Sequence, residues 1–149
     1  MIAMLGVRER SAARIAGGRD PLGPLGERAA GRFLRRAGYR VLGRNVRVRA
    51  GEADLVCEAP DRRTVVIVEV KSRRRGAGSH PASEAIAPEA SITAHKKRTL
   101  VAVTRSLVRL NRWEDRPVRI DVVAVEWPVR GRRRPTIRHF VGAVGLESR

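Results

Sequence analysis

The run of residues 65–71, Val-Val-Ile-Val-Glu-Val-Lys, constrains the fold of this chain more than any other segment. Five of its seven residues are β-branched, which is typical of a strand buried in a core. Glu69 and Lys71 end the run two residues apart, so they share one face of the strand about 7 Å from each other. A buried carboxylate is costly unless it is paired or binds a metal. The pair therefore predicts either a functional site or a plain salt bridge.

A second carboxylate can be placed beside Glu69 by counting through the following turn. Residues 60–63, Pro-Asp-Arg-Arg, are typical of a turn between two strands. A hairpin that is symmetric about this turn places Asp54 opposite Glu69, and Glu52 opposite Lys71. Strict alternation along this first strand places its residues on two faces: Glu52, Asp54, Val56 and Glu58 on one, and Ala53, Leu55 and Cys57 on the other.

Opposed carboxylates predict a metal site. Asp54 and Glu69 would lie about 5 Å apart across the hairpin, where two negative charges repel each other. A divalent cation between them relieves this repulsion, and hard oxygen ligands favour Mg²⁺ or Mn²⁺. The inference depends on the turn, because a slip of one residue would send the acids to opposite faces.

Lysine usage supports a functional role for Lys71. The chain has 32 lysine and arginine residues, of which only Lys71, Lys96 and Lys97 are lysine. Lysine is a compact donor whose pKa falls on burial, so it can position or activate a water molecule where arginine cannot. We therefore expect Lys71 to be catalytic. Lys96 and Lys97, early in a predicted helix, either contact nucleic acid or are only solvated.

The overall charge indicates a polyanionic partner. The 149 residues suffice for one domain with a core, and the net charge is +17. Such a charge suits contact with the phosphate backbone of DNA or RNA. The lone Cys57 excludes a disulfide framework and a cysteine zinc cluster, and it predicts a small core residue in a reducing cytoplasm. No segment is long enough to span a membrane.

The chain is expected to divide into a flexible basic arm (residues 1–22), one domain (23–143) and a short tail (144–149). A helix from Pro24 to Gly38 would present a basic face that includes Arg28 and Arg32. Glu27 lies on the boundary of this face and has two interpretations. It is either an acid in the first helical turn, which favours the positive helix end, or a third carboxylate of the metal site.

The remaining elements are expected to follow in order. We predict a strand over residues 39–49 with a kink at Gly43, a mobile loop over 72–91, a helix over 93–112, and strands over 117–127 and 136–141. Arg73 and Arg74 in the loop suit phosphate contacts, although a solvated charge run is an equal alternative. His80 is interpreted as a loop residue. Asp121 is either a fourth acid of the site or a structural aspartate paired with Arg119.

Several short motifs together resemble the YraN-like family of bacterial proteins, over roughly residues 23–143. They are Gly26-Glu27, Gly38-Tyr39, Asn45-Val46-Arg47, Gly51-Glu52-Ala53-Asp54-Leu55-Val56, Val68-Glu69-Val70-Lys71-Ser72-Arg73, Lys96-Lys97-Arg98 and Arg119-Ile120-Asp121-Val122. That family is similar to Holliday-junction resolvases and to restriction endonucleases of the PD-(D/E)xK type.

The resemblance implies an α/β fold with a restriction-endonuclease-like mixed β-sheet flanked by helices. It assigns Asp54 as the motif aspartate, Glu69 as the second acid, Lys71 as the motif lysine and Glu27 as the first-helix glutamate. The proline of the literal motif is replaced by Ala53.

The sequence thus predicts a metal-dependent nuclease. Asp54 and Glu69, with Glu27, would hold Mg²⁺ or Mn²⁺, and Lys71 would assist the attacking water. The expected substrate is DNA, branched or otherwise structured, with RNA left open, and a homodimer is also left open. No small-molecule cofactor and no membrane partner are expected. The alternative is a nucleic-acid-binding module that keeps the fold without catalysis. A ribosome-associated protein, which the charge alone would allow, has no need of the paired acids.

Overall fold

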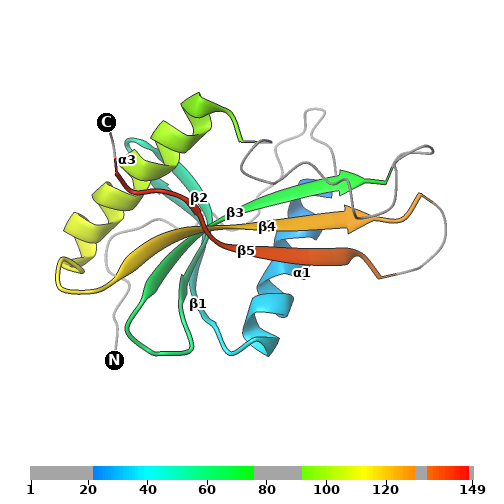
Figure 1. Cartoon of the computed structure of the whole chain (residues 1–149), viewed down its shortest axis with the longest axis horizontal. Helices are drawn as coiled ribbons and strands as arrows, with labels where there is room; N and C mark the ends of the chain where they lie inside the picture. Colours follow the sequence, from blue (N-terminus) through cyan, green and yellow to red (C-terminus); the bar gives the residue numbers. More distant parts are fainter. Residues whose placement is uncertain (1–21, 76–91, 130–133, 148–149) are drawn as a thin grey trace.

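The computed structural model describes residues 22–75, 92–129 and 134–147. This part of the chain forms a five-stranded sheet with the strand order β1-β2-β3-β4-β5 and a helix packed on each face (Figure 1). The elements are α1 (Leu22–Arg36), β1 (Arg40–Val48), β2 (Gly51–Glu58), β3 (Val65–Arg74), α3 (Ala94–Asn111), β4 (Val118–Trp127) and β5 (Thr136–Val144).

The sheet is mixed. β1, β2 and β3 are successive antiparallel neighbours, β3 and β4 are parallel, and β5 returns antiparallel to β4. The parallel pair needs a crossover connection, and α3 lies between these two strands in the sequence. The α/β class is confirmed, and the architecture is consistent with a restriction-endonuclease-like domain.

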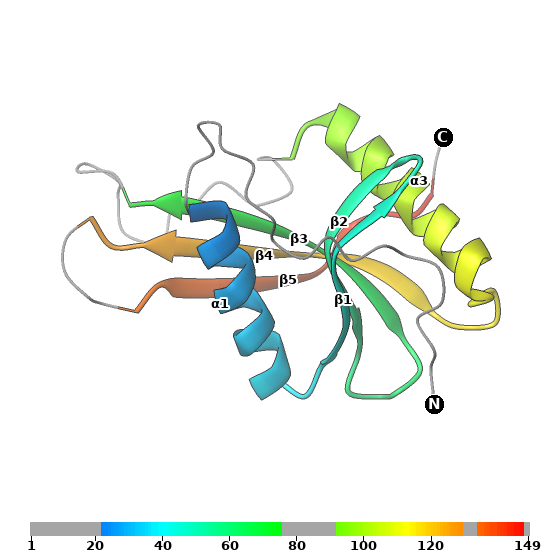
Figure 2. The ribbon, with the colours of Figure 1, turned by 180° about the vertical axis from the view of Figure 1, so that it is seen from behind.

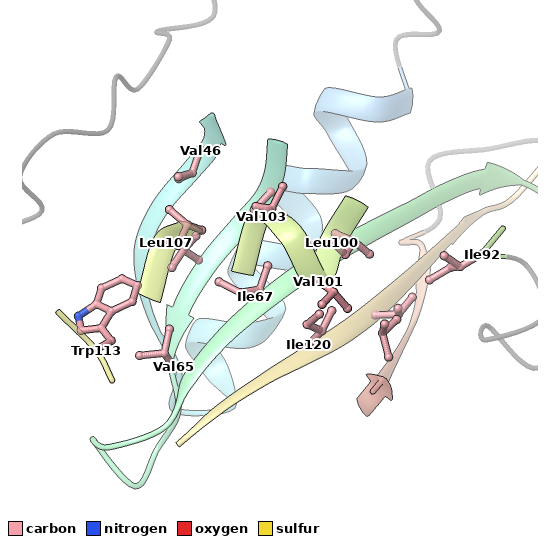
Figure 3. Close-up of a cluster of buried hydrophobic side chains, with 14 residues drawn as sticks. Val46, Val65, Ile67, Ile92, Leu100, Val101, Val103, Leu107, Trp113 and Ile120 are labelled. Atoms are coloured by element: carbon pink, nitrogen blue, oxygen red, sulfur yellow. The ribbon is translucent and has the colours of Figure 1, made fainter. Parts of the chain in front are cut away.

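The central strand β3 is buried on both faces, as its β-branched composition predicts. Val65 and Ile67 face α3, whereas Val66 and Val68 face α1. Figure 3 shows the first of these two layers, in which side chains of α3, among them Leu100, pack over the sheet. Each fully buried side chain of this size contributes about 1.5–3 kcal/mol. These two layers hold β3 in place between the helices, and they therefore position Glu69 and Lys71 near its end.

Helix α1 ends as the sequence predicts but begins earlier. Gly38 adopts a left-handed φ of 90°, and the next backbone N–H, of Tyr39, donates to Leu34 O at 3.0 Å, which closes the helix. The helix starts at Leu22, two residues before the expected position, and Leu22 is buried rather than part of a flexible arm. Gly26 touches β3: a Cβ at this position would lie 2.5 Å from Ser72 Cβ.

The register of the β2–β3 hairpin is confirmed. Leu55 pairs with Val68, and the pairing continues through Glu58 and Val65 to the turn. Asp61 holds this turn, because its carboxylate accepts the backbone N–H groups of residues 63 and 64 at 2.9 Å. The Thr64 hydroxyl also donates to this carboxylate, and this bond first, followed by the two backbone bonds, lowers the pKa of Asp61 to about 2.

The pairing of β2 with β3 stops at Leu55, and the two strands then diverge. The first residues of β2 turn towards α3, where a Cβ on Gly51 would lie 2.8 Å from Thr99 Cγ2. Figure 2 shows the connection between β1 and β2 beside α3, while the ends of β3 and β4 extend in the other direction. The expected face of Ala53 is therefore wrong: it packs in the α3-side core and not with Leu55. The expected opposition of Glu52 and Lys71 is also wrong, because the ladder does not reach them.

Other expectations have mixed outcomes. A register shift in β1 lies between Val41 and Gly43, at the predicted kink. Residues 72–74 were expected in a loop, but they extend β3, since they pair with residues 125–127 of β4. The buried Cys57 is a core residue, and burial raises its pKa to about 12. His80, with most of the expected loop, the N-terminal arm up to residue 21 and the basic segment 130–133, lies outside the described residues.

Candidate active site

The divergence of β2 from β3 creates the place where the predicted acids meet. Asp54 is the first residue of β2 beyond the ladder, and its Oδ2 accepts the backbone N–H of Val70 at 2.7 Å. Beyond the last strand pair, the Asp54 side chain thus replaces a backbone carbonyl as the acceptor for a β3 N–H group. This bond holds the carboxyl of Asp54 close enough to Glu69 for the negative charge of Glu69 to raise the pKa of Asp54. Asp54 and Glu69 are thus close enough to interact, but the ladder ends one pair before them, so they are not the directly opposed strand pair that was predicted.

Glu69 is buried between two lysines. Lys71 Nζ lies 3.3 Å from Glu69 Oε1, and Lys96 Nζ, from the first turn of α3, lies 3.1 Å from Oε2. The glutamate side chain is 5% exposed, while those of Lys71 and Lys96 are 42% and 33% exposed. Oε2 is buried without an aligned hydrogen-bond donor, so Lys96 gives it an ion pair but no hydrogen bond. This oxygen retains free acceptor capacity.

Asp54 is the most perturbed acid of the cluster. Burial first, and then the negative charge of Glu69, raise the pKa of Asp54 from 3.8 to about 7. The hydrogen bond from Val70 and the charge of Lys96 oppose this change but do not cancel it. A carboxyl with this pKa is partly protonated at neutral pH, and a cation can take the place of the proton.

Glu27 reaches the same region from α1. Burial raises the pKa of Glu27, and Glu52 and Glu69 add to the rise, whereas a hydrogen bond from the Asn45 side chain and the charge of Arg44 oppose it. Glu27 is not in the first turn, because the helix begins at Leu22. The helix-dipole interpretation is therefore wrong, since that effect falls off within one turn. Its electrostatic contact with Asp54 and Glu69 agrees with the third-carboxylate interpretation.

The carboxylates of Asp54 and Glu69 suit a hard divalent cation whose coordination is completed by other ligands. Within residues 22–75, 92–129 and 134–147, no three His, Cys, Asp or Glu side chains converge as a ready metal cage. Magnesium commonly takes only one or two carboxylates, with water and substrate phosphates filling the other positions. Asp54, which is strained by a like charge, and the free oxygen of Glu69 fit this pattern.

Asp121 belongs to a separate, structural network. Its carboxylate is fully buried and ion-paired with Arg119, whose Nε lies 3.0 Å from Oδ1. His139 Nε2 lies 2.8 Å from Oδ2, and the backbone N–H of Gly142 donates to Oδ1 at 2.9 Å. These hydrogen bonds and the charge of Arg119 outweigh burial and lower the pKa of Asp121. The interpretation as a structural aspartate is confirmed, and the network joins β4 to β5.

The basic residues expected to contact nucleic acid lie in different environments. Arg28 and Arg32 are exposed on α1, Arg74 is exposed at the end of β3, and Lys97 is half-buried on α3. Arg73 is instead paired with Glu126 of the neighbouring strand, with Nε 3.0 Å from Oε1. Lys96 is held by Glu69, as described above.

Sequence reasoning missed two neighbours of the acids. Lys96 was assigned to nucleic-acid contact, whereas the structure places it on Glu69. Its position on the line of the buried Leu100 and Val103 was the available signal, because it puts Lys96 next to the core-facing stripe. Asn45 has a left-handed φ of 48° and holds Glu27. Asparagine tolerates this conformation, but no local pattern indicates that the Asn45 side chain would form a hydrogen bond with an acid on α1.

No helix in the described ranges is long and apolar enough to cross a membrane.

Comparison with known proteins identifies a family. The family model described as Uncharacterised protein family UPF0102 matches residues 26–125, which include all four predicted catalytic residues.

Bacterial relatives described as UPF0102 proteins resemble most of the chain. One from Pelobacter propionicus is 37% identical over 83% of this chain and 82% of its own length. One from Anaeromyxobacter dehalogenans is 36% identical over 89% and 90%. One from Symbiobacterium thermophilum is 41% identical over 76% and 88%.

Proposed function

The chain belongs to the uncharacterised protein family UPF0102, and from the arrangement of its acids and lysines we propose that it is a metal-dependent nuclease acting on DNA. The observation that carries the proposal is the pair of carboxylates at the fork, the place beyond Leu55 and Val68 where β2 and β3 diverge. Asp54 has a raised pKa beside Glu69, whose Oε2 is buried without a hydrogen bond and whose Oε1 meets Lys71. An ion pair between Glu69 and Lys71 that served only the structure would need neither Asp54 beside it nor a glutamate oxygen without a hydrogen bond.

The proposed roles follow from the contacts. Asp54 and Glu69, with Glu27 beside them, would hold Mg²⁺ or Mn²⁺. When bound, such a cation polarises the phosphate and lowers the pKa of a coordinated water. Lys71 is the more exposed of the two lysines, so its ammonium group can reach a water or a phosphate oxygen. Lys96 balances the charge of Glu69 from the α3 side.

The cationic surface supplies the affinity for the substrate. A net charge of +17 attracts a polyanion over its whole length, and arginine forks pair well with phosphate oxygens. The exposed Arg28 and Arg32 on α1 would contact the backbone. The proposed substrate class is DNA with a branch or another irregular structure, and RNA is a further arm of the test.

A non-catalytic nucleic-acid-binding module is the second candidate, and one observation favours it. Glu69 already has two lysine neighbours, and no three-ligand metal cage forms among the described residues. In such a module the lysines neutralise Glu69 permanently, and the site only stabilises the fork. This candidate predicts DNA affinity that a chelator does not change, and no cleavage with any metal.

A cleavage screen separates the two candidates. The protein is incubated with branched, flapped, duplex and single-stranded DNA, and with RNA, in Mg²⁺, in Mn²⁺ and in chelator. We expect cleavage of at least one substrate with metal, loss of cleavage in Asp54→Asn, and unchanged cleavage in Asp115→Asn, an exposed acid outside the site. Cleavage that persists in Asp54→Asn, or its absence in wild type on every substrate, would refute the proposal.

Thermal unfolding tests the metal site without any substrate. Ligands that bind the folded state raise the melting temperature. Magnesium or manganese should raise it for wild type and for Asp115→Asn, and should leave Asp54→Asn unchanged. Equal responses of wild type and Asp54→Asn would show that the metal binds elsewhere.

A further inference from the structure

A pocket lined by arginines lies away from the acids. It has a volume of about 570 Å³ and is formed where α1 ends, β1 begins and the β2–β3 turn passes. Four of its nine lining residues are arginines, and they come from three separate segments: Arg35, Arg40, Arg44 and Arg62.

The arginines of this pocket are incompletely neutralised. Arg40 pairs with Glu58 at 2.8 Å, but Glu58 is shared with Arg116 at the same distance. Within the described residues, Arg35 and Arg62 form no ion pair with an acid. The nearby Asp61 uses its carboxylate to hold the turn. The pocket therefore carries excess positive charge and fits an anion that accepts several guanidinium donors.

Arg44 connects this pocket to the acids. A Cβ on Gly31 would lie 2.7 Å from Arg44 Nη2, so the guanidinium group lies directly against the helix at Gly31. Glu27, Gly31 and Arg35 are spaced by four residues and follow one line along α1. Arg44, packed on Gly31, therefore lies between the position of Glu27 and the pocket along this side of α1.

We propose that this pocket binds backbone phosphates of the DNA strand whose cleavage is proposed above. The eight residue steps from Glu27 to Arg35 correspond to about 12 Å along the helix axis. This length corresponds to roughly three to four nucleotides at 3.4 Å of axial rise each. The strand would follow the direction of α1, with one phosphate at the acids and another in the pocket. This inference rests on the proposed function for the position of the scissile phosphate.

A charge-matched comparison tests the pocket. Arg35→Ala combined with Arg62→Asn removes two pocket charges, and asparagine keeps the left-handed φ of 59° at position 62. The control combines Arg36→Ala with Arg112→Asn. Arg36 is the exposed neighbour in the same helical turn, and Arg112 is an exposed arginine with a φ of 55°.

Binding of a fluorescent DNA oligonucleotide is measured in chelator over a range of salt concentrations. The slope of log affinity against log salt should become shallower by about 1.5 in the pocket variant, because each lost phosphate contact contributes roughly 0.7–0.9. The control should change by less than about 0.5, since its arginines lie outside the pocket. Equal slopes in the two double variants would overturn the proposal.

Neutral methylphosphonate linkages, introduced singly along the oligonucleotide, locate the contact. At one position of the oligonucleotide, the neutral linkage should weaken binding to the wild type and to the control variant, but not to the pocket variant. In magnesium, that position should lie three to four nucleotides from the cut. If every neutral linkage reduced the affinity equally in both double variants, the proposed phosphate contact in the pocket would be refuted. Failure of cleavage overturns only the proposed nuclease activity, because the binding comparison is made without metal.

Discussion

The electrostatic strain at Asp54 should appear as a pH dependence of stability in the metal-free protein. Burial and Glu69 raise the pKa of Asp54 from 3.8 to about 7 in the folded state. Between these values the folded protein holds a proton that the unfolded chain has released. The free energy of unfolding therefore falls as the pH rises through this window, and the contribution of Asp54 has been lost above about pH 7.

The expected magnitude follows from the width of the window. Each pH unit inside it changes stability by about 1.4 kcal/mol, so the step from pH 5.5 to 7 removes roughly 2 kcal/mol. The pKa values of Asp61, Asp121 and Glu126 are lowered. Their stabilising contributions are lost only as the pH falls below the unfolded values, so they stay constant above about pH 5. The raised pKa of Glu27 acts in the same direction as that of Asp54.

Urea unfolding of wild type and Asp54→Asn in chelator isolates the contribution of Asp54. Asparagine keeps an acceptor for the Val70 N–H but cannot titrate. The difference in unfolding free energy between wild type and variant should fall by about 2 kcal/mol from pH 5.5 to pH 8. Asp115→Asn, exposed, should parallel wild type. Parallel profiles for wild type and Asp54→Asn would refute the raised pKa and the proximity of the two acids.

Three further predictions follow from particular contacts. Gly26→Ala should lower the free energy of unfolding by about 1–2 kcal/mol, measured in urea, because its Cβ would overlap Ser72 and outweigh the gain in helix propensity. Asp121→Ala should cost about 3–5 kcal/mol in the same assay, because it leaves Arg119 without its acid in a buried network; a loss below 1 kcal/mol would contradict that role. Lys71→Ala should abolish cleavage while DNA affinity, measured by fluorescence anisotropy, changes less than about threefold, since it removes one of many positive charges; retained cleavage would remove Lys71 from the mechanism.

Local patterns in the sequence predicted the hairpin that positions the acids. Alternation and turn chemistry were enough to align Leu55 with Val68, because Asp61 holds a tight turn that leaves one register. Gly38 and Gly43 marked a helix end and a strand irregularity for similar local reasons. These features depend on a few consecutive residues, so a single sequence contains the information.

Features that depend on distant segments were not predictable in this way. Alternation placed Ala53 on the wrong face, because β2 leaves β3 at this point and follows α3. Residues 72–74 resemble a charged loop, and only pairing with β4 makes them a strand. The contact of Lys96 with Glu69 depends on how α3 docks. The arginine pocket likewise depends on the β2–β3 turn, because this turn brings Arg62 to residues 35–44.

The short ladder between β2 and β3 has a consequence for the mechanics of the domain. Among the described residues, the ladder that joins the two halves of the sheet has four residue pairs, from Leu55–Val68 to Glu58–Val65, and one further backbone bond joins Ala59 to Thr64 at the turn. Beyond them the link is the bond from the Val70 N–H to Asp54. A cation that binds both Asp54 and Glu69 would hold the two halves of the sheet together. The exchange rate of this single amide hydrogen is therefore a backbone reporter of occupancy at the fork, and bound metal should slow it.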